Sequence, residues 1–179
     1  MTPTLRYARE GDIEAIVRLV NAAYRPAPGA AGWTHEGHLV AGPRITAPML
    51  RALLGDRSVV LLLTEDPRIL ACVHVKVEAD AACLGMLATD PAVQAKGLGK
   101  LMLESAESQA RSQFGIVRFR MAVISARPEL LAFYERRGYV RTGESEPFHP
   151  EGDVSQPRVE GLELLWLEKP LATCARTPA

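Results

Sequence analysis

Two glycines that flank a single residue, Gly97 and Gly99, lie between an apolar segment and a segment with helical periodicity. Glycine adopts positive φ without steric cost, and its missing side chain lets a ligand approach the backbone closely. The first N–H groups of a helix have no partner within that helix, and they favour an anion. We therefore expect the turn that contains these glycines to bind a diphosphate.

The surrounding residues do not fit two common diphosphate-binding motifs. A Walker A loop would need a glycine at Gln94 and a serine or threonine at Leu101. A dinucleotide-binding fingerprint that began at Gly97 would need a small third residue at Met102. Two interpretations remain at this point, the diphosphate of another cofactor and a glycine-rich turn without a ligand.

Apolar periodicity predicts the elements that must position this turn. A helix should begin after Asp12, where apolar residues recur at helical spacing up to Tyr24, and a short helix capped by Thr46 should follow. The order β-α-α-β-β-β-α-β-α-β-β predicts a mixed α/β sheet in one domain, residues 1–171, followed by a disordered tail, 172–179. We expect strands at 5–8, 58–64, 69–77, 83–89, 118–124, 139–142 and 162–167, and longer helices at 98–114 and 129–137.

The glycine turn is one of two segments that resemble the GNAT acetyltransferases. Gln94, Gly97 and Gly99 fit the pattern Q/R-x-x-G-x-G/A, with which that family grips the diphosphate of coenzyme A. The segment Leu130–Tyr139 is similar to the family's short helix that carries a tyrosine and ends at Gly-Phe or Gly-Tyr. The resemblance covers residues 5–171 and is strongest between residues 84 and 139.

This resemblance implies a fold. We expect a mixed, mostly antiparallel sheet of six to seven strands with helices on both faces. The fourth and fifth strands, 83–89 and 118–124, should splay apart and hold the pantetheine arm of the cofactor between them.

The resemblance also implies an activity, N-acetyl transfer from acetyl-CoA to a primary amine by direct attack of the neutral amine on the thioester. Tyr134 is the expected general acid for the leaving thiolate, because a phenol stays protonated at neutral pH; an aromatic side chain packed on the sheet is the alternative. The backbone N–H of Leu87 is the expected oxyanion donor. Many relatives have an asparagine where this chain has Arg127. The residues expected to contact acetyl-CoA are Leu87, Ala88, Thr89, Gln94, Ala95, Lys96, Gly97, Leu98, Gly99, Lys100, Ser125 and Tyr134.

The acceptor amine and the general base leave less signal. Trp33, Glu36 and Arg44 lie in the long connection after the first helix, and His74 lies on the third strand, on the face opposite to its valine neighbours. Arg44 could pair with a carboxylate on the substrate. Each of these side chains could instead have only a surface or structural role, and a water chain without a dedicated base is an equal alternative.

The composition limits the partners. Lys plus Arg and Asp plus Glu both number 21, so no net positive charge favours nucleic acid or an anionic membrane. The three cysteines show no metal-binding spacing, so we expect no metal. The first residues lack the apolar stretch of a signal peptide, and we expect a cytoplasmic protein.

A small-molecule amine is the expected acceptor, because one compact domain carries no separate recognition module. A protein N-terminal or lysine acetyltransferase and a non-catalytic coenzyme A-binding module are the alternatives. The polar stretch at residues 146–161 could cover a second copy of the chain in a homodimer, or the mouth of the active site.

Overall fold

The structure, a computed structural model, describes residues 3–26, 35–94, 96–149 and 154–170. Trp33, Ala95 and the expected tail at 172–179 lie outside the described residues. The elements are β1 (Thr4–Tyr7), α1 (Ile13–Tyr24), β2 (Val40–Ala41), α2 (Ala47–Leu53), β3 (Ser58–Glu65), β4 (Arg68–Glu78), β5 (Ala81–Thr89), α3 (Leu98–Phe114), β6 (Arg118–Ile124), α4 (Pro128–Glu135), β7 (Val140–Pro147), β8 (Gln156–Pro157) and β9 (Glu163–Pro170). Short 3₁₀ turns at Glu10–Asp12 and Pro91–Val93 precede α1 and α3.

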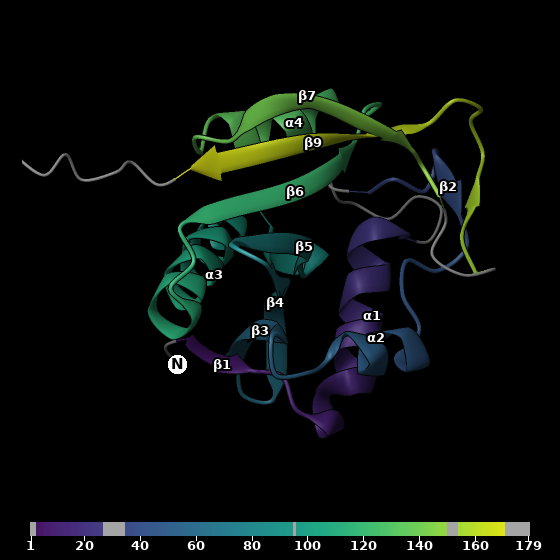
Figure 1. Cartoon of the computed structure of the whole chain (residues 1–179). Coiled ribbons are helices and arrows are strands. Elements are labelled where there is room, and N and C mark those ends of the chain that lie inside the picture. The colour runs from purple at the N-terminus through teal and green to yellow at the C-terminus, as the bar shows by residue number, and fades with distance from the viewer. Residues whose placement is uncertain (1–2, 27–34, 95, 150–153, 171–179) are drawn as a thin grey trace, which may run out of the picture.

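Seven strands form one sheet in the order β1-β3-β4-β5-β6-β9-β7 (Figure 1). All its neighbours are antiparallel except β5 and β6. The parallel pair is joined only where Ala81–Cys83 lies beside Arg118–Arg120, at the start of both strands. Beyond these residues the strands diverge, so the predicted mixed sheet with a splay between its fourth and fifth strands is confirmed.

Helices cover both faces of the sheet, as predicted. One buried cluster packs α3 and α4 against residues such as Val73 and Val75. A second cluster packs α1 and α2 against the other face, where Cys72 and Val60 point. The strand β4 is buried on both faces because its side chains alternate between these two clusters.

Of the two predicted helix caps, Thr46 caps its helix with its side chain and Asp12 does not. The Thr46 hydroxyl accepts from the backbone N–H of Met49 at 3.5 Å, which confirms the predicted cap of α2. Asp12 does not cap α1 with its side chain. Its carboxylate instead accepts two 2.7 Å hydrogen bonds from Arg6 on β1 and closes the turn before the helix.

The two long connections of the chain meet in a small second sheet, which the sequence patterns did not predict. β2 pairs with β8 through Val40 opposite Pro157 and Ala41 opposite Gln156. The hydroxyl of Ser155 also donates to the carbonyl of Pro43 at 2.6 Å. These contacts bring the stretch after β7 beside the connection between α1 and α2.

Candidate active site

The predicted glycine turn lies at the N-terminus of α3. Gly97 has φ of 77° and is the N-cap residue of α3, so no side chain satisfies the N–H groups of the first turn from this position. A Cβ built on Gly97 would meet nothing within 4 Å, so open space lies beside its backbone. At this end of the helix, the N–H of Leu101 donates to the carbonyl of Gly97 at 3.0 Å. The N–H groups of the first turn therefore face outward with the positive end of the helix dipole.

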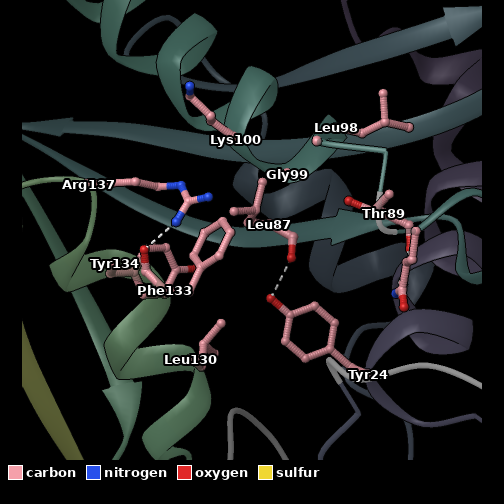
Figure 2. Close-up of a pocket in the computed structure, with 12 residues that line it drawn as sticks. Tyr24, Leu87, Thr89, Leu98, Gly99, Lys100, Leu130, Phe133, Tyr134 and Arg137 are labelled. Carbon is pink, nitrogen blue, oxygen red and sulfur yellow. Dashed lines mark hydrogen bonds between the residues drawn. The ribbon is translucent and has the colours of Figure 1, made fainter.

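A pocket of about 730 Å³, counted out to its open mouth, begins at this turn (Figure 2). The wall comes from the end of α1, from β5, from the turn and first residues of α3, and from α4. The lining residues are Tyr24, Leu87, Thr89, Gln94, Gly97, Leu98, Gly99, Lys100, Leu130, Phe133, Tyr134 and Arg137.

A β-bulge shapes the side of the pocket formed by β5. The register with β4 shifts between Cys72 and His74, and Met86 has φ of 50°. The extra residue re-aims the backbone beside it. The hydroxyl of Tyr24 donates to the carbonyl of Leu87 at 3.0 Å, so the peptide after the bulge is held in place by a side chain of α1 (Figure 2).

Tyr134 is buried in α4, and its ring packs edge-on against Phe133 and Tyr139, with centroids 5.2 Å and 6.0 Å away. Burial raises the pKa of Tyr134 to about 12, against the opposing positive charges of Arg127 and Arg137. Within the described part of the chain, no hydrogen bond is made by its hydroxyl. The phenol is therefore protonated at neutral pH and lies in the pocket wall with its donor available.

Arg137 is a pocket residue that the sequence did not single out. Its guanidinium lies 3.5 Å from the centroid of the Phe133 ring and donates to the Phe133 carbonyl at 2.5 Å. The pKa of Arg137 lies below the ordinary value for arginine, and burial is the largest cause. Together with Lys100 it places positive charge on the part of the wall that adjoins the glycine turn (Figure 2).

Most of the residues expected to contact the cofactor line this pocket: Leu87, Thr89, Gln94, Gly97, Leu98, Gly99, Lys100 and Tyr134. Three do not. Ala88 is buried against the α1 face, Lys96 is exposed, and Ser125 is half-buried at the end of β6, where its N–H donates to the carbonyl of Glu163 at 2.8 Å. Tyr24, Leu130, Phe133 and Arg137 also line the pocket. Their apolar spacing, or for Arg137 its place among charged residues, gave no functional signal.

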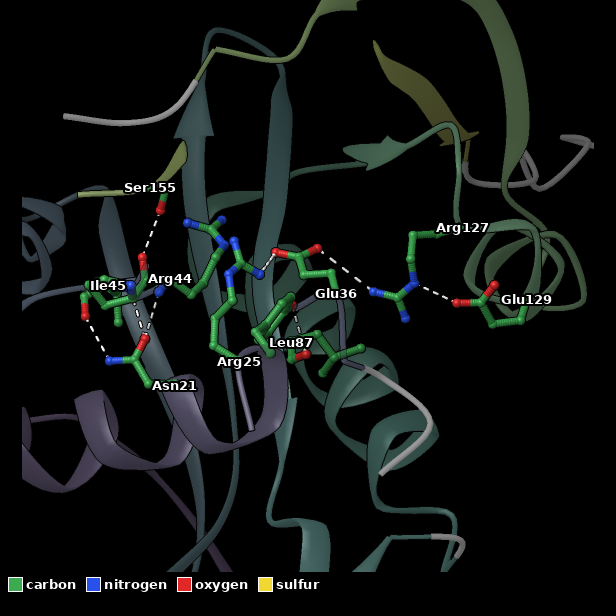
Figure 3. A network of polar contacts seen from close by, with 11 residues as sticks. Asn21, Arg25, Glu36, Arg44, Ile45, Leu87, Arg127, Glu129 and Ser155 are labelled. Atoms are coloured by element: carbon green, nitrogen blue, oxygen red, sulfur yellow. Dashed lines mark hydrogen bonds and ion pairs between the residues drawn. The ribbon is translucent and has the colours of Figure 1, made fainter. Parts of the chain in front are cut away.

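The residues expected to contact the acceptor amine lie in different surroundings in the structure. His74 is buried in the sheet with its Nε2 2.8 Å from the Ser58 hydroxyl, and it does not line the pocket. Arg44 donates its backbone N–H to the Asn21 side chain at 2.7 Å, and its guanidinium lies 5.7 Å from the centroid of the Tyr24 ring. Glu36 is buried, and it is drawn with Arg44 in the polar network of Figure 3.

Glu36 belongs to a network of charged side chains (Figure 3). One of its oxygens contacts Arg25, and the other lies 3.7 Å from Nη1 of Arg127. The Nε of Arg127 donates to Glu129 at 2.5 Å. Both oxygens of Glu36 thus face guanidinium groups rather than the pocket.

The comparisons with known proteins agree with this geometry. The sequence model of the Acetyltransferase (GNAT) family matches residues 13–139, which is well over half of the chain. The chain therefore belongs to the Acetyltransferase (GNAT) family.

A curated relative is the [ribosomal protein bS18]-alanine N-acetyltransferase of Salmonella typhimurium strain LT2, which is 33% identical over 85 residues. The match spans 48% of this chain and 57% of that protein.

Two solved structures share the fold. The ribosomal-protein-S18-alanine N-acetyltransferase from Escherichia coli superposes with a TM-score of 0.71 at 18% identity and covers 99% of both chains. The yncA structure from Salmonella typhimurium, which contains its cofactor acetyl-CoA, has a TM-score of 0.63 at 19% identity and covers 100% of this chain and 99% of the other.

The residues present fit the cofactor of this family, acetyl-CoA. The open space beside Gly97 leaves room for a phosphate next to the N–H groups of the first turn of α3. Gly99 packs closely on the pocket wall, since a Cβ there would lie 3.6 Å from the Phe133 ring. In the described part of the chain, no group of three or more His, Cys, Asp or Glu residues could hold a metal ion, and no helix could span a membrane.

Proposed function

We propose that this enzyme transfers the acetyl group of acetyl-CoA to the primary amine of a small molecule by direct attack. The observation that supports it best is one pocket that joins the α3 glycine turn, the β5 bulge at Leu87 and the Tyr134 side chain. A diphosphate anchor, a strained backbone segment and a protonated phenol are the groups that acetyl transfer from a thioester requires.

The chain would hold the cofactor mainly through its backbone. The N–H groups from Gly97 to Lys100 bind the diphosphate, and Lys100 and Arg137 add positive charge beside it. The gap between β5 and β6 accepts the pantetheine arm. When bound, acetyl-CoA supplies a thioester whose carbonyl is open to an amine nucleophile.

Leu87 and Tyr134 act on the reacting atoms. The N–H of Leu87 stabilises negative charge on the carbonyl oxygen, and Tyr24 holds that peptide by its hydrogen bond to the Leu87 carbonyl. Tyr134 donates its phenolic proton to the leaving sulfur, since its raised pKa keeps the proton in place at neutral pH. We assign no general base, because Glu36 is held between two arginines and His74 lies away from the pocket.

A second candidate is acetylation of a protein N-terminus, which the name of the bS18-alanine acetyltransferase relative favours. The match to that relative covers little more than half of its length, and sequence identity to the solved homologue is 18%. We also propose that the protein is cytoplasmic, as expected from the sequence, whichever acceptor it uses.

The test is thiol release by the pure protein with acetyl-CoA and separate panels of amino acids, polyamines and short peptides that begin with alanine. The proposal expects release with at least one small amine and not with the peptides alone. Turnover confined to peptides would favour the second candidate. Binding of acetyl-CoA without thiol release in any panel would indicate a non-catalytic module.

A further inference from the structure

Three charged side chains that do not line the pocket are buried together, next in the chain or in contact with neighbours of residues that do line it. The side chains of Arg25, Glu36 and Arg127 are 8%, 7% and 1% exposed, whereas Glu129 beside them is 45% exposed. The buried set carries two positive charges and one negative charge. The contact of Arg127 with Glu129 balances the second positive charge from the more exposed side, so unpaired hydrogen-bond donors, and not surplus charge, mark a place for a ligand.

The hydrogen-bonding capacity of the arginines points the same way. Among the described residues, Nη1 and Nη2 of Arg127 and Nε of Arg25 are buried without a hydrogen-bond partner. The distance of 3.7 Å between Nη1 of Arg127 and Glu36 is an ion pair but too long for a hydrogen bond. Arg127 thus keeps two donors on one edge of its planar group, and two such donors match the two oxygens of a carboxylate.

The cluster adjoins the catalytic end of the pocket. Arg25 directly follows the pocket residue Tyr24, and Arg127 directly precedes α4, which carries Leu130 and Tyr134. The charge of Arg127 acts on the Tyr134 phenol and lowers its pKa against the larger effect of burial. Burial raises the pKa of the pocket residue Tyr24, and the nearby Tyr134 and Glu36 raise it further, which places Glu36 within electrostatic reach of the pocket.

We propose that Arg127, assisted by Arg25, binds a carboxylate of the acceptor, so that the acceptor is a small amino acid and not a polyamine or a protein N-terminus. This inference rests on the proposed acetyltransferase function and names its substrate class. A carboxylate offers two oxygen acceptors to the unpaired donors of Arg127, whereas a polyamine offers none. The residue at a protein N-terminus has an amide in place of the carboxylate.

Binding requires one rearrangement. Because the Arg127 donors are covered in the structure, the substrate carboxylate replaces Glu36 at Arg127 while Glu36 keeps its closer contact with Arg25. The longer of the two contacts of Glu36 is the one that opens. Arg127 therefore positions the acceptor and takes no part in proton transfer.

The test compares acceptors that differ only in the carboxylate. Thiol release is measured at saturating acetyl-CoA with each free amino acid and with its carboxamide. Hydrogen bonds to a charged partner predict a kcat/KM that is about 10- to 100-fold higher for the best amino acid than for its amide. Equal values, or a preference for the amide, would overturn the inference and leave the acetyltransferase function standing.

Variants assign the preference to Arg127. Arg127→Met should raise KM for the amino acid at least about tenfold and bring the kcat/KM preference for the amino acid over its amide down to about one, because any effect of the lost charge on Tyr134 acts on both acceptors alike. Arg18→Met, on an exposed position of α1, is the matched control and should change neither. If Arg127→Met does not fold, Arg25→Met and the comparison in the unaltered protein decide.

A binding measurement tests the carboxylate site even if the protein proves not to be an acetyltransferase. If no acceptor releases thiol, the melting temperature of the coenzyme A-bound protein is measured with amino acids and with their amides. A rise with an amino acid but not with its amide keeps the carboxylate site. No rise with any amino acid overturns it.

Discussion

Alanine variants of the two glycines at opposite ends of α3 can distinguish the effect of backbone strain from an effect on cofactor binding. Gly97 before the helix and Gly115 after it have φ of 77° and 66°, and a Cβ at either position would meet nothing within 4 Å. Gly97 lines the pocket, whereas Gly115 does not. Alanine at each position therefore imposes the same left-handed strain on the same helix, but only Gly97→Ala places a methyl group in the cofactor's space.

The magnitudes follow from that difference. A left-handed non-glycine residue costs about 1–2 kcal/mol. In a chain of this size each kcal/mol lowers Tm by about 2–4 °C, so both variants should melt roughly 2–8 °C lower and remain folded. The added methyl group should raise the Kd for acetyl-CoA at least about tenfold in Gly97→Ala, equivalent to about 1.4 kcal/mol. Gly115→Ala should bind within about twofold of the unaltered protein.

Isothermal titration with acetyl-CoA measures the affinities, and thermal unfolding without ligand measures the strain. Equal affinities for the two variants would refute the assignment of the turn as the diphosphate site, whatever their stabilities. Weakened binding in both, in proportion to their loss of stability, would show that helix strain and not the methyl group controls affinity.

Three further outcomes test the site and its support. Tyr134→Phe should lower kcat about 10²- to 10⁴-fold with the acetyl-CoA Kd within about twofold, while Tyr7→Phe on the exposed β1 should change neither; equal losses of rate and binding would make Tyr134 structural. Because its pKa is raised to about 12, Tyr134 stays protonated below that pH. The rate should therefore rise as the amine deprotonates and should show no alkaline decline at any pH below about 9.5; a decline at lower pH would require another acid. Glu107→Gln should cost about 3–5 kcal/mol in urea unfolding, because buried Glu107 pairs with Lys169 at 2.8 Å, whereas exposed Glu104→Gln should cost under about 0.5 kcal/mol; equal costs would contradict the buried pair.

The parts of the fold that the sequence predicted are those set by local periodicity and by backbone requirements. The alternation in β4 follows from which residues must be buried and agrees with the two core clusters, whereas helical spacing in α3 predicted the helix but not its exact buried face, since Leu101 is exposed. The glycines before α3 were recognisable because few other residues adopt the φ of Gly97. Each of these signals lies within a short segment.

The parts that could not be predicted depend on contacts between distant segments. The pairing of β2 with β8 joins residues more than a hundred positions apart, and two-residue strands have no periodicity. Tyr24 carries the spacing of a core residue, yet its hydroxyl reaches the Leu87 carbonyl. His74 on a strand could have faced solvent or a cleft, and only the packed sheet shows it beside Ser58.

The two ends of the pocket also differ in what fixes their chemistry. At the glycine turn the proposed donors are backbone groups, so that end of the pocket depends on the conformation of the turn more than on the identity of its side chains. At the other end, Arg25 and Glu36 come from the connection between α1 and α2. Lengthening or altering such a connection costs little stability, because the entropy of closing a loop grows slowly with its length. The fold therefore constrains the cofactor strongly and the acceptor weakly, and the identity of the acceptor is to be sought in the charges of that connection and of Arg127, not in the sheet that carries them.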